Sequence, residues 1–118
     1  MRKILFRGKR TDNGEWAEGF LTDEKHIGTW LLTIPIIPET VGQYTGLTDR
    51  NGKRIFEGDI VKHHTIPMLV KFDEKSASFL VGYTMNGSYY ENTLHGHGYL
   101  EVIGNIHDNP ELLEVRND

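Results

Sequence analysis

The sequence predicts an all-β protein, and three features support this prediction. Asn-Gly pairs occur at 13–14, 51–52 and 86–87, each between segments with strand character. Glycine and asparagine can both adopt the positive φ of a two-residue hairpin turn, so each pair is a candidate turn. Short runs with an apolar residue at every second position flank these pairs, as expected of half-buried strands. Only one segment, near the C-terminus, has the features of a helix.

Strands are predicted wherever apolar residues alternate, because successive side chains of a strand point to opposite faces. The segment Ile34–Pro38 differs, since its two prolines lack an N–H and favour an extended connection or an edge strand. The alternating positions are Trp30, Leu32 and Ile34, then Met68, Val70 and Phe72, then Phe79, Val81 and Tyr83, and finally Leu100 and Val102.

The C-terminal end is predicted to form a short helical turn. Asp108 and Asn109 offer a cap, Pro110 suits the first helical position, and Glu111 complements the positive end of the helix dipole. Such a short helix has little stability of its own, so we expect it to dock on the sheet through the apolar residues that follow.

Strand spacing predicts two regions within a single domain of 118 residues. From residue 55 to 115 the predicted strands are short and closely spaced, which is typical of a small, strongly bent barrel whose closure removes exposed edges. Residues 1–48, with the strands around Trp16 and Trp30, are predicted to form a β-hairpin extension added to that barrel.

The composition narrows the possible classes of function. The chain has no cysteine, which excludes disulfides, thiolate metal sites and cysteine nucleophiles. No stretch approaches the length needed to span a bilayer, so we expect a cytoplasmic protein without a membrane partner. The net charge of −4 argues mildly against general binding of nucleic acid.

The charge is nevertheless uneven along the chain, and five basic residues crowd its first ten positions. They could contact phosphates, while Tyr89, Tyr90 and Tyr99 could stack on bases. In the alternative interpretation, the basic residues protect an edge strand from unwanted pairing and the tyrosines pack across strands. The basic residues are Arg2, Lys3, Arg7, Lys9 and Arg10.

Six histidines raise the question of a metal site. His95 and His97, at i and i+2, would share one face of a strand, and His63, His64 or His107 could complete a ligand set. The glycines between and beside the pair favour exposed loop histidines instead. We therefore predict no metal and no cofactor.

Carboxylates at 57 and 59 and at 73 and 74 could in principle supply acid–base pairs. Aspartate readily bonds its own local backbone, so a Gly-Asp corner and a polar hairpin loop explain these residues better. No serine lies in a nucleophile-elbow context, and no glycine-rich loop has the spacing that holds a nucleotide. We expect a protein that is not an enzyme.

Several segments spread over nearly the whole chain carry a resemblance to a known family. They are Phe6–Arg10, Trp16–Gly19, Thr40–Leu47, Asp49–Gly52, Ile55–Val61, Val102–Ile106 and Asn109–Leu113. With these segments in family order, the chain resembles the YopX-like family of phages and prophages. This resemblance implies an SH3-like β-barrel with an N-terminal β-rich extension, a phage origin and self-association, and it transfers no catalytic or binding residue.

Two functional hypotheses follow. The favoured one is a non-enzymatic assembly or protein-interaction module, a homo-oligomer that could also bind a phage or host protein. Trp16, Trp30 and the Ile34–Pro38 connection would supply its contacts. The alternative is a nucleic-acid-binding accessory protein that uses the basic N-terminal segment.

Overall fold

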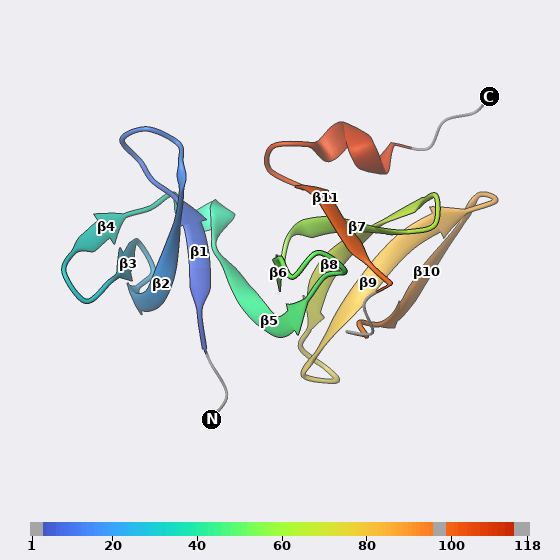
Figure 1. The fold of residues 1–118 in the computed structure, drawn as a ribbon, viewed down its shortest axis with the longest axis horizontal. Coiled ribbons are helices and arrows are strands. Elements are labelled where there is room, and N and C mark those ends of the chain that lie inside the picture. Colours follow the sequence, from blue (N-terminus) through green and yellow to red (C-terminus); the bar gives the residue numbers. More distant parts are fainter. Residues whose placement is uncertain (1–3, 96–98, 115–118) are drawn as a thin grey trace. The chain divides into compact units, whose positions relative to one another are not determined.

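The protein is all-β, as predicted. The structure is a computed structural model that describes residues 4–95 and 99–114. Within these residues the only helices are two single 3-10 turns, η1 (Pro38–Thr40) and η2 (Pro110–Leu113). The strands are β1 (Phe6–Lys9), β2 (Trp16–Asp23), β3 (His26–Gly28), β4 (Thr33–Pro35), β5 (Gly42–Thr48), β6 (Arg54–Phe56), β7 (Asp59–His63), β8 (Ile66–Asp73), β9 (Ser78–Met85), β10 (Ser88–Thr93) and β11 (Glu101–Asn105) (Figure 1).

The chain divides into two compact units, residues 1–46 and residues 47–118. In unit 1 the strands follow the order β4-β3-β2-β1-β5, with antiparallel pairing throughout the described registers. Its small core centres on Ile27 and Ile36, which are 0% and 2% exposed. Gly8 allows Ile36 to pack this closely, because a Cβ at Gly8 would lie 2.8 Å from the Ile36 Cδ1 atom.

Unit 2 is built on an antiparallel sheet of order β10-β9-β8-β7-β11. Alternating residues of β8 and β9 supply one apolar face, as the sequence predicts. The buried members of the core are Ile55, Val61, Met68, Val70, Val81 and Leu94. Among the described residues the strands form no closed barrel, with β10 and β11 at the two ends of the strand order. The SH3-like barrel therefore stays a prediction.

All three Asn-Gly pairs lie between successive strands, but only one forms the expected two-residue turn. At 86–87 both residues have positive φ, 53° and 79°, and β9 passes directly into β10. At 51–52 the pair lies, as predicted, in the turn that joins the neighbouring strands β5 and β6, but the two-residue type was wrong, since only Gly52 has positive φ. There the Gly52 N–H donates to the Asp49 carbonyl at 3.0 Å, within a longer loop that Asp49 organises.

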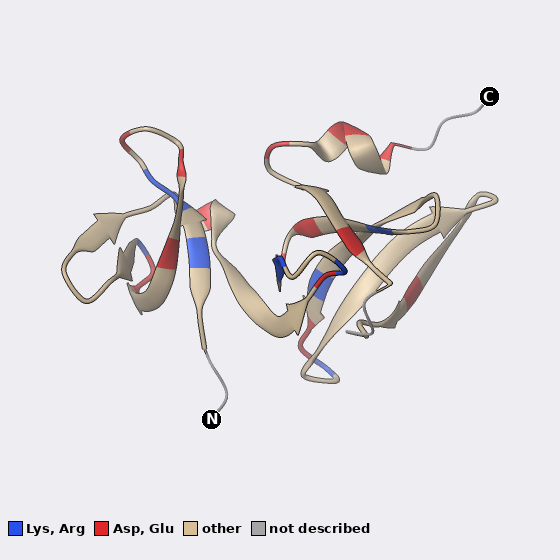
Figure 2. Ribbon diagram, viewed as in Figure 1, with Lys and Arg blue, Asp and Glu red and all other residues tan. Residues whose placement is uncertain are grey.

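Two further predictions were wrong for identifiable reasons. Residues 29–32 form a loop between β3 and β4 rather than part of an alternating strand, and this loop lacks acidic and basic side chains (Figure 2). At the C-terminal turn, Asn109 makes no side-chain cap to η2. Its Oδ1 instead accepts the Asn105 N–H at 3.2 Å, tying the turn to the end of β11. The strand β4, which overlaps the start of Ile34–Pro38, is at the edge of its sheet, as predicted.

A buried carboxylate joins distant parts of unit 2. Asp49 is 5% exposed, and its Oδ1 accepts the N–H groups of Asn51 and Lys53, both at 2.8 Å. Its Oδ2 accepts the N–H of Val102 in β11 at 3.0 Å, across 53 positions of sequence. Burial raises the pKa of Asp49, but the three N–H donors outweigh burial and hold the pKa below its ordinary value of 3.8.

Replacing this carboxylate should destabilise unit 2. In Asp49→Asn one oxygen becomes an amide NH2 that faces a backbone N–H, so we expect a loss of about 1–3 kcal/mol in the free energy of unfolding. Asp73→Asn is the matched control, because the described bonds of the Asp73 side chain, to Ser76 and Lys75, lie within its own exposed hairpin turn. The control should change stability by less than about 0.5 kcal/mol in urea denaturation. Equal losses in the two variants would contradict the assigned role of Asp49.

The same site predicts a pH dependence. Because the folded pKa of Asp49 lies below the unfolded value, its contribution is present above about pH 4 and disappears as the pH falls through the folded pKa. The stability gap between the wild type and Asp49→Asn should therefore narrow as the pH falls below about 4. Urea denaturation at several pH values measures this gap, and contributions of other carboxylates cancel in the difference. A gap that widens on acidification would contradict the pKa assignment.

Candidate protein-interaction surface

Unit 1 presents three consecutive large apolar side chains to solvent. Trp30, Leu31 and Leu32 are 88%, 69% and 62% exposed and occupy the loop between β3 and β4. We call these three residues the apolar turn. Contiguous exposed apolar side chains are uncommon on a monomeric protein and usually mark an interaction site.

The apolar turn is an ordered structure. The Thr29 N–H donates to the Leu32 carbonyl at 2.7 Å, closing the loop. The Thr29 hydroxyl oxygen also accepts the N–H groups of Leu31 and Leu32, at 3.3 and 3.0 Å. These bonds satisfy the N–H groups of Thr29, Leu31 and Leu32, which a strand would have paired, while the loop projects its apolar side chains.

The strands below the apolar turn hold it in place. Gly28 pairs with Thr33, and Ile27 pairs with Ile34 in the β3–β4 ladder. Ile27 is fully buried, which anchors the hairpin in the core of unit 1. The exposed side chains therefore stand at the end of a hairpin whose base is packed.

Other predicted contact residues take different positions. Trp16 is half-buried, with the Arg7 guanidinium 4.5 Å and the Lys9 ammonium 5.6 Å from its ring centre. Within the Ile34–Pro38 connection, Ile36 is part of the core at 2% exposure. Ile37 in the same connection is 36% exposed, and Trp30, at 88%, is the most exposed large hydrophobic residue among the predicted contacts.

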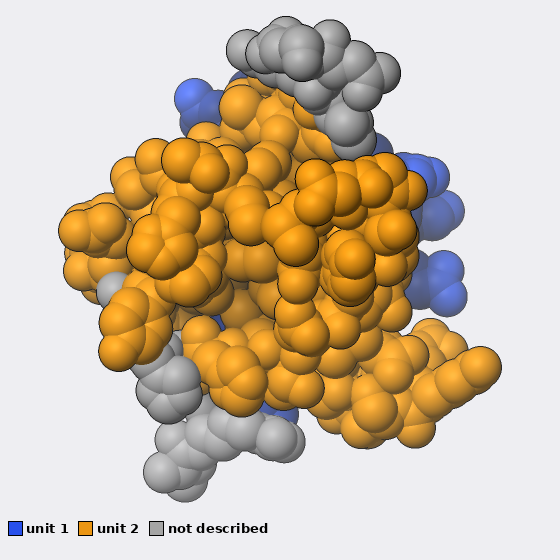
Figure 3. Space-filling model, turned by 90° about the vertical axis from the view of Figure 1, so that its right-hand side faces the viewer, with its two compact units in different colours: residues 1–46 blue, residues 47–118 orange. Residues whose placement is uncertain are grey.

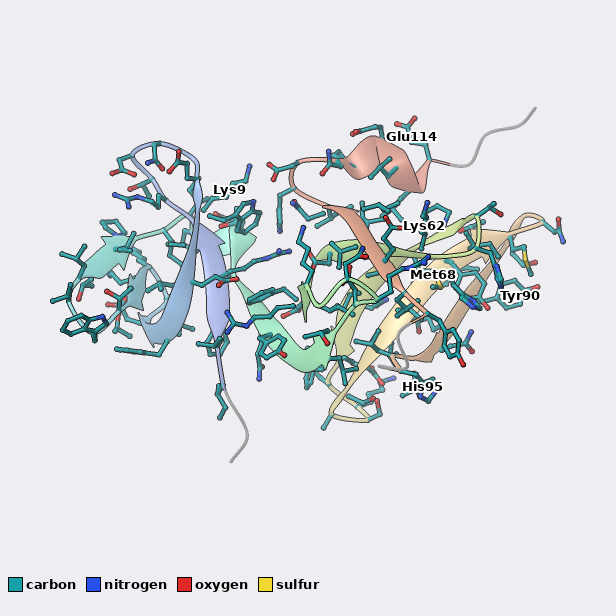
Figure 4. The ribbon with its side chains drawn as sticks, viewed as in Figure 1. Lys9, Lys62, Met68, Tyr90, His95 and Glu114 are labelled. Atoms are coloured by element: carbon teal, nitrogen blue, oxygen red, sulfur yellow. The ribbon has the colours of Figure 1, made fainter. Side chains whose placement is uncertain are left out.

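Among its described residues, the basic N-terminal segment has no fully exposed basic side chain: Arg7 is buried, and Lys9 and Arg10 are half-buried. Arg7 is 9% exposed against Trp16, so its guanidinium has a packing role. Arg10 forms an ion pair with Asp12 at 2.8 Å, and this hydrogen bond raises the pKa of Arg10. Lys9, labelled in Figure 4, is half-buried. Arg2 and Lys3 lie outside the described residues, and nucleic-acid binding stays a prediction.

The candidate stacking tyrosines lie in unit 2, whereas the basic segment belongs to unit 1. Tyr90 stacks on Tyr83 with ring centres 5.5 Å apart. Tyr89 belongs to a polar cluster in which Lys71 and Glu91 form an ion pair at 2.6 Å and both contact the Tyr89 hydroxyl. Two of the three tyrosines are thus engaged across strands, as in the alternative interpretation of these residues.

The structure describes only part of the possible metal site built on His95 and His97, because His97 lies outside the described residues. Within residues 4–95 and 99–114, no three His, Asp or Glu side chains converge as metal ligands would. His63 and His64 contact each other, with ring centres 4.3 Å apart.

Two of the four candidate acid–base carboxylates have local structural partners. Asp59, 1% exposed, accepts the Phe56 N–H at 2.7 Å and so shapes the Gly-Asp corner. Asp73 accepts the Ser76 N–H and hydroxyl, and the hydroxyl bond lowers the pKa of Asp73. These contacts match the structural interpretation of both residues.

Unit 2 contains an apolar groove of about 350 Å³ that sequence reasoning did not find. It lies on the core face of β8 and β9, where Met68 and Val81 are buried at its floor and Met85 is 40% exposed. Figure 3 shows part of the surface of this unit, and Figure 4 labels Met68 and His95, which both line the groove. Further lining residues, among those that the structure describes, are His63, Ile66, Tyr83, Asn92, Thr93, Tyr99 and Leu100.

Two other clefts of unit 2 carry charge. A wider cleft of about 700 Å³ lies beside η2 and includes Lys62, Glu111 and Glu114. A third, of about 340 Å³, includes Arg50, Lys62 and Glu101. The apolar groove differs from both because its described lining residues include no Asp, Glu, Lys or Arg.

No helix in the described part of the chain has both the length and the apolar character needed to cross a membrane.

Comparisons with known proteins indicate the family to which the chain belongs. No curated protein matches the chain. A crystal structure of protein EF1440 from Enterococcus faecalis is similar, with 27% identity over 97% of this chain and 100% of that one, at a TM-score of 0.48. The YopX protein family matches residues 5–114. Since this match spans nearly all of the 118 residues, the chain belongs to the YopX protein family.

Proposed function

We propose that this chain is a non-enzymatic assembly module that binds a second copy of itself through the apolar turn. The supporting observation is the exposure of Trp30, Leu31 and Leu32 on a loop that Thr29 holds closed. Removing such side chains from water is favourable, and a large aromatic residue buries about 150–250 Å². Tryptophan is also over-represented among the residues that dominate binding energy at interfaces.

Order in the apolar turn favours binding further. A loop that is already closed loses less conformational entropy on association than a flexible one. The Thr29 hydroxyl and the paired strands β3 and β4 provide this preorganisation. The turn also lacks charge, so its burial in an interface carries no cost of desolvating an ion.

The remaining parts of the proposal rest on the resemblance to phage and prophage proteins. The assembly would act in the cytoplasm of a bacterial host cell, with a phage or host protein as a further partner. Unit 2 would be an SH3-like barrel in outline. The structural bonds of Asp49, Asp59 and Asp73 support a non-enzymatic role, because these carboxylates already serve the fold.

Shortening the tryptophan should weaken self-association. We expect Trp30→Ser to raise the dissociation constant on the order of 30-fold, because removing an aromatic hot spot typically costs at least about 2 kcal/mol. Sedimentation velocity over a concentration series measures the change. Tyr89→Ser is the control, since Tyr89 is also an exposed aromatic residue, at 58%. A wild-type chain that stays monomeric throughout, or equal effects of both variants, would overturn the proposal.

Loosening the loop should have a smaller effect. Thr29→Val keeps the shape of the side chain but removes the hydroxyl that accepts two backbone N–H groups. Because the loop then pays an ordering cost on binding, we expect weaker self-association with the unfolding transition nearly unchanged. Sedimentation velocity and thermal melting separate the two effects. Unaltered association would show that preorganisation of the loop is unimportant.

A further inference from the structure

We propose that the apolar turn of one copy inserts into the apolar groove in unit 2 of a second copy. This inference rests on the proposed self-association and adds the surface that receives the turn. It joins two independent features, one exposed apolar projection and one apolar recess, that belong to different units of the same chain.

The groove has the architecture of a recess for apolar side chains. Met68 of β8 and Val81 of β9 lie at the bottom, 7% and 5% exposed, because alternate residues of both strands face the core. Met85 and Tyr99 stand higher, at 40% and 69% exposure, and are available to cover an inserted group. Methionine side chains are flexible and polarisable, so they adapt well to an aromatic partner.

Charge distinguishes the groove from the other recesses. Neither the apolar turn nor the part of the groove lining that the structure describes contains an Asp, Glu, Lys or Arg side chain. Seating the turn in the wider cleft would instead desolvate charged groups such as Lys62 and Glu111, which is costly without a partner of opposite charge. The groove is therefore the receptor that an uncharged turn fits best.

The volume of the groove also favours the apolar turn as its occupant. The groove measures about 350 Å³, near the lower end of the range of about 300–1,000 Å³ for small-molecule sites. A recess of this size suits one aromatic side chain with a neighbouring aliphatic one, as the apolar turn offers in Trp30 and its adjacent leucines. Polar groups at the margin, Asn92 and Thr93, can bond backbone groups of the incoming loop.

The pairing constrains the symmetry of the assembly. The turn lies in unit 1 and the groove in unit 2, so the two surfaces of one contact are different. A single contact leaves an unused groove on the copy that inserts its turn and an unused turn on the copy that receives it. The assembly therefore either closes as a two-fold dimer with two reciprocal contacts or extends into a larger ring or a filament. A dimer with two-fold symmetry through the turn alone would use the same surface on both copies.

The test combines variants that each lack one half of the contact. Trp30→Ser removes the turn, and Met85→Glu places a carboxylate in the groove. Both variants should weaken self-association on the order of 30-fold. Thr84→Glu is the matched control, because Thr84 is the exposed neighbour of Met85 on β9 and is absent from the groove lining, so it should associate as the wild type does.

Mixing the two deficient variants gives the decisive result. Met85→Glu still carries a turn and Trp30→Ser still carries a groove, so an equimolar mixture should form a heterodimer and nothing larger in sedimentation velocity. This complex also shows that Met85→Glu remains folded. No complex in the mixture would overturn the pairing, as would wild-type association of Met85→Glu. These outcomes differ from a failure of self-association itself. In that case the unmodified chain stays monomeric.

A cross-link gives an independent check. A photoreactive phenylalanine analogue at position 30 of the full chain should attach to groove residues of another copy, Ile66, Tyr83, Met85 or Tyr99, in a product of twice the chain mass. Attachment mainly to residues 20–36 of a second copy would indicate a turn-to-turn contact and overturn the pairing.

Discussion

The Asp49 carboxylate is the interaction on which the arrangement of unit 2 depends. It fastens the loop after β5 to β11, and Arg50 adds a bond from its N–H to the Leu100 carbonyl at 2.8 Å. Tyr99 and Leu100, at the margin of the apolar groove, are therefore placed by a contact that lies outside the groove. Stability and the shape of the groove are coupled through this one buried acid.

The two units differ in how they distribute buried and exposed apolar side chains. Unit 1 has few buried apolar residues, centred on Ile27 and Ile36, yet it exposes three apolar side chains in its β3–β4 loop. Unit 2 has the larger core and keeps a recess on the core face of β8 and β9. In the proposed assembly, unit 1 of one copy supplies the exposed apolar turn, and unit 2 of a second copy supplies the groove that buries it. Association would then bury the apolar side chains of the turn, which are exposed in the single chain.

Much of unit 2 could be predicted from sequence because local pattern and tertiary environment agree there. Alternation in β8 and β9 and the Asn86-Gly87 turn are signals within a few residues. The loop at 29–32 was missed because its apolar residues match an alternating strand, while the Thr29 hydroxyl favours a closed turn. Its signal was the unbroken run Trp30–Leu32. The Asp49–Val102 bond and the groove arise from long-range pairing that no local pattern contains.

The central claim is that the uncharged turn at 29–32 is exposed in the single chain and buried between copies. Hydrogen–deuterium exchange of the wild-type chain over a series of concentrations tests this most directly. The account predicts that backbone amides of residues 29–33 and of the strand ends beside the groove, at 83–85 and 92–95, gain protection together as concentration rises. Exchange that is independent of concentration in both segments, while the chain demonstrably associates, would contradict it.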